Sequence, residues 1–173
     1  MTPITSEPVV RWRWLGLAAL LWAMDQAIKF GVMQTMQLHD SIAIVPGFNW
    51  VYALNPGAAF SFLADAGGWQ RYFFTALALA VSTVLGVLLW CGVASRLEAL
   101  AYALLMVGAL GNGADRVHTG AAVDYLDIYW RNWHWPAFNL ADICVCIAAL
   151  LLVMGAWQQG RQTQPGTEKH HAT

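Results

Sequence analysis

Charged side chains are scarce in this chain, at 11% of 173 residues, whereas a soluble domain carries roughly 25%. Hydrophobic residues make up 58%, and the formal net charge is −1. A nearly neutral chain offers no basic surface to nucleic acid, so we expect no nucleic-acid partner. The shortage of charge excludes an ordinary soluble surface and indicates a membrane protein.

Metal and cofactor motifs are also missing. The five histidines lack the spacing of metal ligands. The sequence contains neither a Gly-rich loop followed by Lys-Ser or Lys-Thr nor a Gly-x-Ser-x-Gly elbow. Cys91, Cys144 and Cys146 all lie inside apolar runs, where we expect buried packing residues. The sequence therefore predicts no metal site and no cofactor.

Four apolar runs are close to the ~20 residues that a helix needs to cross hydrocarbon. We expect transmembrane spans over 12–33, 71–94, 97–116 and 136–157. Pro136 suits the first turn of the last span, where no backbone donor is needed. These spans form one domain at 12–157, with extracytoplasmic loops at 34–70 and 117–135. A cytoplasmic N-terminus at 1–11 precedes the domain, and a polar, disordered cytoplasmic tail at 158–173 follows it.

The first loop contains a predicted β element. Ser41–Val45 and Phe48–Leu54 are β-branched or aromatic runs joined by Pro46-Gly47, which is typical of a hairpin. The predicted fold is an all-α membrane protein of four transmembrane helices, with a small extracytoplasmic β-sheet or cradle between helices 1 and 2. The aromatic segment 125–135 is expected to lie in the plane of the membrane interface.

Basic residues predict the orientation, because positively charged residues near the spans favour the cytoplasm. Four spans place both termini on one side. That side carries the larger set of basic residues: Arg11, Arg13, Arg96, Arg161 and Lys169. The opposite loops carry Arg71 and Arg131. We expect a multi-pass protein of a bacterial inner membrane with both termini in the cytoplasm.

Four acids, Asp25, Asp115, Asp124 and Asp142, lie in or beside the predicted spans. A charged side chain at the bilayer centre costs roughly 2.5–3.5 kcal/mol on insertion scales, so such residues are functional candidates. The alternating direction of the spans brings all four to the same side of the membrane. This cluster is the strongest sequence evidence for function.

Two carboxyl groups in a site of low dielectric constant do not both ionise easily, and the pair holds one shared proton. One acid then deprotonates water while the other protonates a carbonyl oxygen, which is aspartic-protease chemistry. The spacing does not decide which two of Asp115, Asp124 and Asp142 form the pair.

Polar residues at helical spacing accompany the acids. Asp25 and Lys29 are four apart and predict a structural ion pair or a contact with substrate. Asn112 precedes Asp115, and Asn139 precedes Asp142, each by three residues, so each pair shares one helix face. These pairs indicate a polar site or a hydrogen-bond network that holds the helices together.

Arg116 points to a different face of its helix from Asp115. We expect it to reach toward the headgroups, with a lipid phosphate or a neighbouring carboxylate as its partner.

Five motifs in order resemble the lipoprotein signal peptidase (signal peptidase II) family of bacteria. They are Asp25-Gln26-x-x-Lys29, Asn55-x-Gly57-Ala58-Ala59-Phe60, Gly111-Asn112-x-x-Asp115-Arg116, Val123-Asp124-Tyr125 and Phe138-Asn139-x-Ala141-Asp142. The resemblance covers about residues 12–157. Pro56 departs from the family pattern, where Thr is more usual.

The resemblance implies an aspartic endopeptidase that removes signal peptides from prolipoproteins by cutting before a diacylglyceryl-modified cysteine. Asp124 and Asp142 would be the catalytic pair. Asp115 would be a supporting residue, paired with Arg116 or hydrogen-bonded near the catalytic pair. The implied substrate-binding or supporting residues are Asp25, Lys29, Asn55, Gly57, Asn112, Asp115, Arg116 and Asn139. The implied partners are the prolipoprotein and membrane lipid, and the protein is expected to be a monomer.

Two other functions are compatible with buried acids. A proton-coupled or ion-coupled carrier would use them for transport, but its site usually lies at the midplane. A non-catalytic lipid-binding or scaffold subunit would use the polar pairs to hold its helices together.

Overall fold

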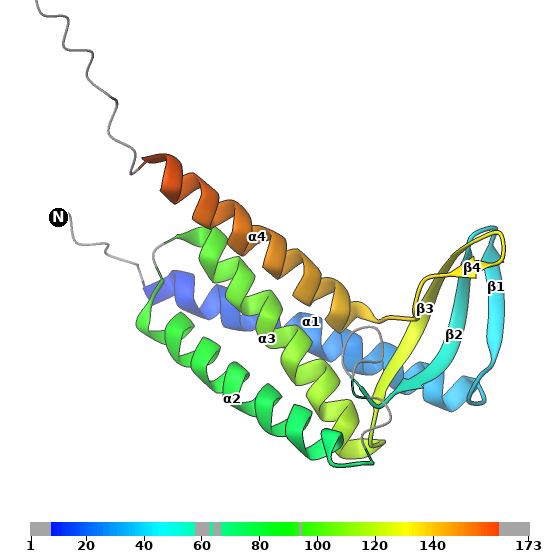
Figure 1. Cartoon of the computed structure of the whole chain (residues 1–173). Coiled ribbons are helices and arrows are strands. Elements are labelled where there is room, and N and C mark those ends of the chain that lie inside the picture. The colour runs from blue at the N-terminus through cyan, green and yellow to red at the C-terminus, as the bar shows by residue number, and fades with distance from the viewer. Residues whose placement is uncertain (1–7, 58–62, 64–66, 94, 163–173) are drawn as a thin grey trace, which may run out of the picture.

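The computed structural model describes residues 8–57, 63, 67–93 and 95–162, and within them the fold is a bundle of long helices with a sheet at one end (Figure 1). The predicted N-terminal segment before residue 8, Ala58, Ala59 and Phe60, and the tail after residue 162 lie outside these residues. The helices are α1 (Pro8–Thr35), α2 (Gln70–Cys91), α3 (Arg96–His118) and α4 (Leu140–Gln162).

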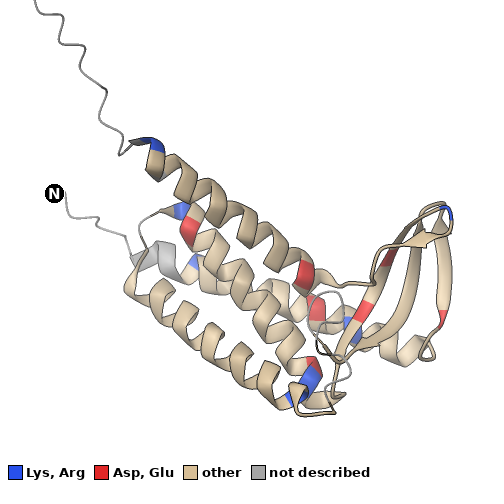
Figure 2. Cartoon of the chain, in the orientation of Figure 1, with Lys and Arg blue, Asp and Glu red and all other residues tan. Residues whose placement is uncertain are grey.

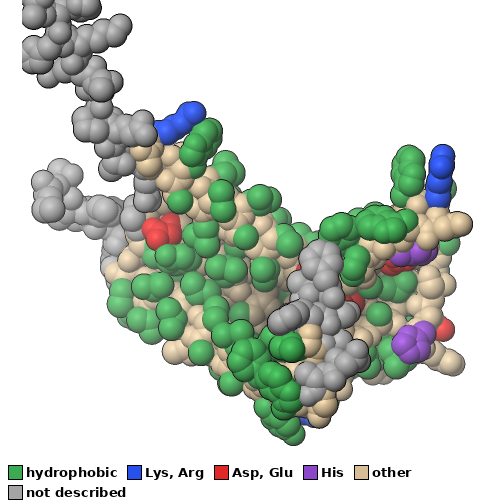
Figure 3. Space-filling view, viewed as in Figure 1, with side chains coloured by type: hydrophobic (Ala, Val, Ile, Leu, Met, Phe, Trp, Pro, Cys, Tyr) green, Lys and Arg blue, Asp and Glu red, His purple; other side chains and the backbone are tan. Residues whose placement is uncertain are grey.

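Each helix is long and apolar enough to cross a membrane. Their outward side chains are hydrophobic, as Figure 3 shows over the bundle; Leu20, Leu79 and Leu150 are each about 60% exposed. Such a surface is stable only in lipid. The predicted four-helix membrane fold is confirmed.

Small residues let α3 occupy the middle of the bundle, in contact with α1, α2 and α4. Ala99, Ala101 and Ala103 are buried along it. A Cβ atom at Gly108 would lie 2.8 Å from the carbonyl oxygen of Ala141 in α4. Small residues at such contacts allow helix backbones to approach closely in a membrane.

The sheet is larger than predicted. Its strands are β1 (Ser41–Val45), β2 (Phe48–Asn55), β3 (Ala122–Trp130) and β4 (Trp133–His134), in the order β1-β2-β3-β4. The β1–β2 hairpin is confirmed, with Gly47 at a positive φ of 91°.

The aromatic segment 125–135 contains most of β3 and all of β4, and its place in the membrane interface stays a prediction. The backbone of β3 pairs antiparallel with β2 from Phe48 to Asn55. This pairing links the α1–α2 connection to the α3–α4 connection. The sheet therefore forms one structure at the end of the bundle opposite the first residues of α1 and the last residues of α4 (Figure 1).

The fourth helix begins at Leu140, four residues after Pro136. The preceding segment pairs with β3 instead: Phe138 N donates to Leu126 O at 3.0 Å, and Leu126 N donates to Phe138 O at 2.9 Å. Leu140 N also donates to the hydroxyl of Tyr125 at 3.0 Å. The start of α4 is thus fastened to β3.

The three cysteines differ in burial, contrary to the prediction that all are buried. Cys144 is buried, whereas Cys91 and Cys146 are exposed. Cys91 and Cys146 lie on the outer faces of α2 and α4. The prediction was wrong for them because an apolar run does not show which face of the helix is buried.

Candidate active site

Asp124 and Asp142 meet at a single residue, Asn139. The side-chain nitrogen of Asn139 donates to Asp124 Oδ1 at 2.7 Å, and its backbone N–H donates to Asp142 Oδ2 at 3.1 Å. Asp124 comes from β3 and Asp142 from the first turn of α4. The structure therefore brings together the two acids that the family resemblance indicates.

Asn139 and Asp142 form a reciprocal cap at the start of α4. Asp142 N donates to Asn139 Oδ1 at 2.9 Å, while Asp142 Oδ2 accepts from Asn139 N. This is the capping-box arrangement, in which a residue before the helix and an acid three positions later satisfy each other's backbone donors. The cap fixes the carboxylate of Asp142 at the N-terminal end of α4.

Burial alters the acidity of Asp124, whose side chain is only 3% exposed. Desolvation first, and then the nearby charge of Asp142, raise the pKa of Asp124 to about 7. Hydrogen bonds from Asn139 and Asn55 and the charge of Lys29 act in the opposite direction. An acid in this position retains a proton at mildly acidic pH, as a shared-proton pair requires.

Asn112 connects the pair to the interior of the bundle. Its side-chain nitrogen donates to Asp142 Oδ1 at 2.8 Å. Its oxygen accepts from Lys29 Nζ at 3.1 Å and from Asn139 Nδ2 at 3.0 Å. The predicted polar faces of α3 and α4 thus meet directly.

Lys29 is held between two acids. Its Nζ lies 2.8 Å from Asp25 Oδ2 and 2.7 Å from Asp115 Oδ2, and its side chain is 1% exposed. The predicted ion pair between Asp25 and Lys29 is present. Asp115 pairs with Lys29 across the helices, and it also accepts the backbone N–H of Val123 at 3.0 Å. Asp115 therefore supports the strand that carries Asp124.

Gln26 belongs to this network but was not among the predicted site residues. Its Nε2 donates to Asp115 Oδ1 at 3.2 Å and to Gly111 O at 3.3 Å. Its place in the Asp25-Gln26-x-x-Lys29 motif was the sequence signal that could have identified it. Helical spacing within α1 did not indicate which residue Gln26 contacts.

Arg116 is buried, not turned toward the headgroups as predicted. Its guanidinium group donates to the carbonyl oxygens of Asn112 and Gly57 and lies 5.1 Å from the centre of the Phe74 ring. Its observed hydrogen-bond partners are backbone carbonyls, whereas the sequence predicted a lipid phosphate or a neighbouring carboxylate. These contacts tie the segment after β2 to α3.

Asn55 and Gly57 form a turn at the end of β2. Gly57 N donates to Asn55 Oδ1 at 3.1 Å, and the side chain of Asn55 also interacts with Asp124. This turn therefore lies beside Asp124.

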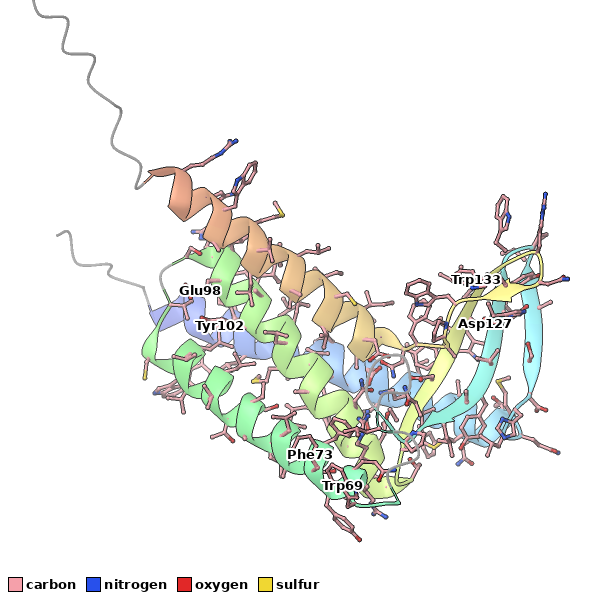
Figure 4. All side chains as sticks on the ribbon, in the orientation of Figure 1. Trp69, Phe73, Glu98, Tyr102, Asp127 and Trp133 are labelled. Atoms are coloured by element: carbon pink, nitrogen blue, oxygen red, sulfur yellow. The ribbon has the colours of Figure 1, made fainter. Side chains whose placement is uncertain are left out.

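Asp127 belongs to a separate cluster. It accepts from Asn49 Nδ2 at 2.8 Å and lies 2.9 Å from Nδ1 of His134. Figure 4 shows Asp127 farther along the sheet, and Figure 2 shows several acidic positions where the sheet meets the bundle. Within the described ranges, no three His, Cys, Asp or Glu residues are grouped to hold a metal ion.

Comparisons with known proteins agree on one family. The family model described as Signal peptidase (SPase) II matches residues 17–158. A lipoprotein signal peptidase of Actinobacillus succinogenes is 48% identical over 149 residues, which cover 86% of this chain and 91% of that protein. One from Shewanella baltica is 45% identical over 168 residues, covering 96% and 97%.

A solved structure described as a bacterial membrane enzyme superposes with a TM-score of 0.78 at 27% sequence identity. The match covers 88% of this chain and 92% of that one. A second bacterial membrane enzyme superposes with a TM-score of 0.71 at 29% identity, covering 83% and 92%. The arrangement of helices and sheet is therefore similar over most of both proteins.

Proposed function

This chain belongs to the signal peptidase II family, and from that membership we propose that Asp124 and Asp142 are its catalytic pair and make it an aspartic endopeptidase. It is a membrane-embedded bacterial protease that removes signal peptides from prolipoproteins. The proposal concerns the residues and the chemistry by which it does so.

The observation that carries this proposal is the double hydrogen bond of Asn139, to Asp124 at 2.7 Å and to Asp142 at 3.1 Å. One residue thereby sets the relative position of both acids. Asp25 and Asp115 are, by contrast, engaged with Lys29 deeper in the bundle. Both acids share the single ammonium group there, which leaves Asp124 and Asp142 as the pair available for proton transfer.

The pair begins the reaction with one proton. The ionised carboxylate takes a proton from water, whose oxygen attacks the carbonyl carbon of the scissile bond, and the protonated acid gives its proton to the carbonyl oxygen. The resulting diol returns that proton to the acid as the C–N bond breaks. The proton taken from water passes to the leaving amine, so one water is consumed and the pair regains its starting state.

The substrate is a prolipoprotein with a diacylglyceryl-modified cysteine after the scissile bond. The site lies where apolar helices meet the sheet, which suits a peptide whose lipid chains remain in the bilayer. Asn55 and Gly57 contact the substrate from the sheet side. Asn112, Arg116 and Asn139 line the site, while Asp25, Lys29 and Asp115 support it.

The bundle spans the inner membrane as a monomer, with the sheet on the extracytoplasmic side. Arg96 is the first residue of α3 and Arg161 lies in the last turn of α4, and both of these helix ends lie away from the sheet (Figure 1). This agrees with the preference of basic residues for the cytoplasm. Both termini then lie in the cytoplasm. The scissile bond is hydrolysed near the outer interface, where water is accessible.

Variants of the two acids test the assignment. Asp124→Asn and Asp142→Asn should each lower cleavage of a diacylglyceryl-modified precursor roughly 10²–10⁴-fold, the usual contribution of a general acid or base. Asp127→Asn is the matched control, since this acid lies on the same strand but contacts Asn49 and His134. Near-normal cleavage by either of the first two variants contradicts the proposed pair. Membrane insertion and thermal stability are measured for all three.

A further inference from the structure

The amide of Asn112 lies between a group that only donates, Lys29, and a carboxylate that accepts, Asp142. Lys29 carries only donors, so it faces the oxygen of Asn112, at 3.1 Å, and not the nitrogen. The nitrogen of Asn112 must then point the other way, where it donates to Asp142 Oδ1 at 2.8 Å. The ammonium group and the carboxylate thus favour the same orientation of Asn112.

The same logic continues to the second amide. Asn112 Oδ1, held toward Lys29, also accepts from Asn139 Nδ2 at 3.0 Å. This contact agrees with the other partners of Asn139. Its nitrogen also donates to Asp124 Oδ1 at 2.7 Å and to Val123 O at 3.2 Å, and its oxygen accepts from the backbone N–H of Asp142 at 2.9 Å. Hydrogen bonds in a chain of this kind support one another.

We propose that Lys29 is a positioning residue whose ammonium group fixes the orientation of the Asn112 and Asn139 amides, so that both acids of the catalytic pair receive N–H donors. The inference rests on the proposed function of Asp124 and Asp142. Lys29 touches neither the substrate nor the reacting atoms in this arrangement. It acts through Asn112.

The reverse orientation would be unfavourable for catalysis. If Asn112 turned, its carbonyl oxygen would face the carboxylate of Asp142, and two acceptors would oppose each other without a proton between them. The carboxylate of Asp142 would then lose the N–H donor that stabilises its ionised form. A pair with two protons has no base to activate water, so turnover falls even when substrate still binds.

Charged groups from three helices surround the pair. Lys29 and Asp25 approach from α1, and Asp115 and Arg116 from α3, while Asp142 itself belongs to α4. Replacing Lys29 alone leaves the two acids of its ion pairs uncompensated. A useful test therefore separates the charge of Lys29 from its role as a donor.

The experiment compares Lys29→Gln with Lys29→Met, both in an Asp25→Asn background. In this background the net charge of residues 25, 29 and 115 is the same as in the wild type. Gln supplies an N–H donor to Asn112 without a charge, whereas Met supplies neither. With a diacylglyceryl-modified precursor, the Gln variant should keep kcat within about tenfold of the Asp25→Asn parent. The Met variant should lose roughly 100-fold in kcat, at the lower end of general acid–base effects, with little change in KM.

The pH profile supplies the second measurement. Loss of the oriented donors should move the ascending limb of the Met variant upward by roughly one unit, the lower end of shifts caused by close polar and charged neighbours. Equal losses in the Gln and Met variants, or parental kcat in the Met variant, would overturn the proposal.

Asn112→Asp is an independent test that leaves Lys29 in place. Its two oxygens put an acceptor against Asp142 whichever way the side chain turns, so we expect a similar loss of kcat. Wild-type kcat in this variant would also overturn the proposal. Cleavage that survives Asp124→Asn or Asp142→Asn is a different result, because it contradicts the catalytic pair itself.

Discussion

Gly108 of α3 lies directly against Val145 of α4: a Cβ atom at position 108 would be 2.2 Å from Val145 Cγ2. It would also be 2.8 Å from the carbonyl oxygen of Ala141, which belongs to the α4 backbone. The side chain of Val145 has few rotamers, and the carbonyl has none. The two helices therefore depend on glycine at this contact.

Gly108→Ala should separate α3 from α4 and move Asp142 relative to Asn112. Overpacking of this kind typically destabilises by about 1–3 kcal/mol. We expect a lower thermal unfolding midpoint in detergent and reduced cleavage. Gly16→Ala is the control, because a Cβ atom there meets nothing within 4 Å. Equal midpoints for the two variants would show that the bundle relaxes without loss.

The pH dependence of cleavage should follow Asp124. Its pKa is raised to about 7, so it keeps its proton from acidic pH up to that value and loses it above. If the pair needs one proton, kcat/KM falls as pH rises through about 7. The measurement is a pH series with a diacylglyceryl-modified precursor in a constant detergent. A rate that is flat from pH 6 to 9 would contradict a protonated acid at this position.

The same raised pKa affects stability. Between the ordinary value of 3.8 and about 7, folded Asp124 holds more proton than unfolded Asp124, so its contribution to stability decreases as pH rises through this window. Asp124→Asn removes that contribution. Its unfolding midpoint should therefore decline less than that of the wild type between pH 4 and pH 7. Parallel declines in the two proteins would argue against the shift.

Arg116→Lys should impair cleavage although the charge is kept. The guanidinium group donates to the carbonyls of Asn112 and Gly57 at once, and an ammonium group does not reproduce this planar geometry. We expect a raised KM, because the turn at Gly57 loses its attachment to α3. Arg161→Lys is the control, since Arg161 stacks on Trp157 at the far end of α4. Unchanged KM in Arg116→Lys would mean that the turn is held by other contacts.

Cleavage should depend on the lipid of the substrate. The site opens where apolar helices meet the sheet, so a precursor whose cysteine lacks the diacylglyceryl group loses its anchor at that depth. We expect a marked fall in kcat/KM for the unmodified precursor with the same sequence. The modified precursor in the same vesicles is the control. Equal rates for both would indicate a peptidase that ignores the lipid.

The sequence predicts the bundle well because hydrocarbon imposes a simple rule on length and polarity. Alternating spans also predict that Asp25, Asp115 and Asp142 meet at one end. Spacing of three or four residues gives the shared helix faces correctly. None of this requires knowledge of which helices are neighbours.

Partners across elements were harder to predict. Helical spacing places Asp115 and Arg116 on their helix but does not say that Lys29 from α1 reaches Asp115, or that Arg116 meets Gly57. Strand β3 was missed for the same reason, because its pairing with β2 joins residues about 75 positions apart and depends on context more than on propensity.

The fastening of Phe138 to Leu126 has a consequence for chain length. This pairing fixes the position of the chain relative to β3 just before α4 begins. Residues added in the tight turn between β3 and β4 therefore bulge outward without displacing Asn139 or Asp142. The distance between the two acids is governed by the few residues from Phe138 onward. Insertions at the tip of the sheet are therefore tolerated, while a single residue inserted between Phe138 and Asp142 dismantles the site.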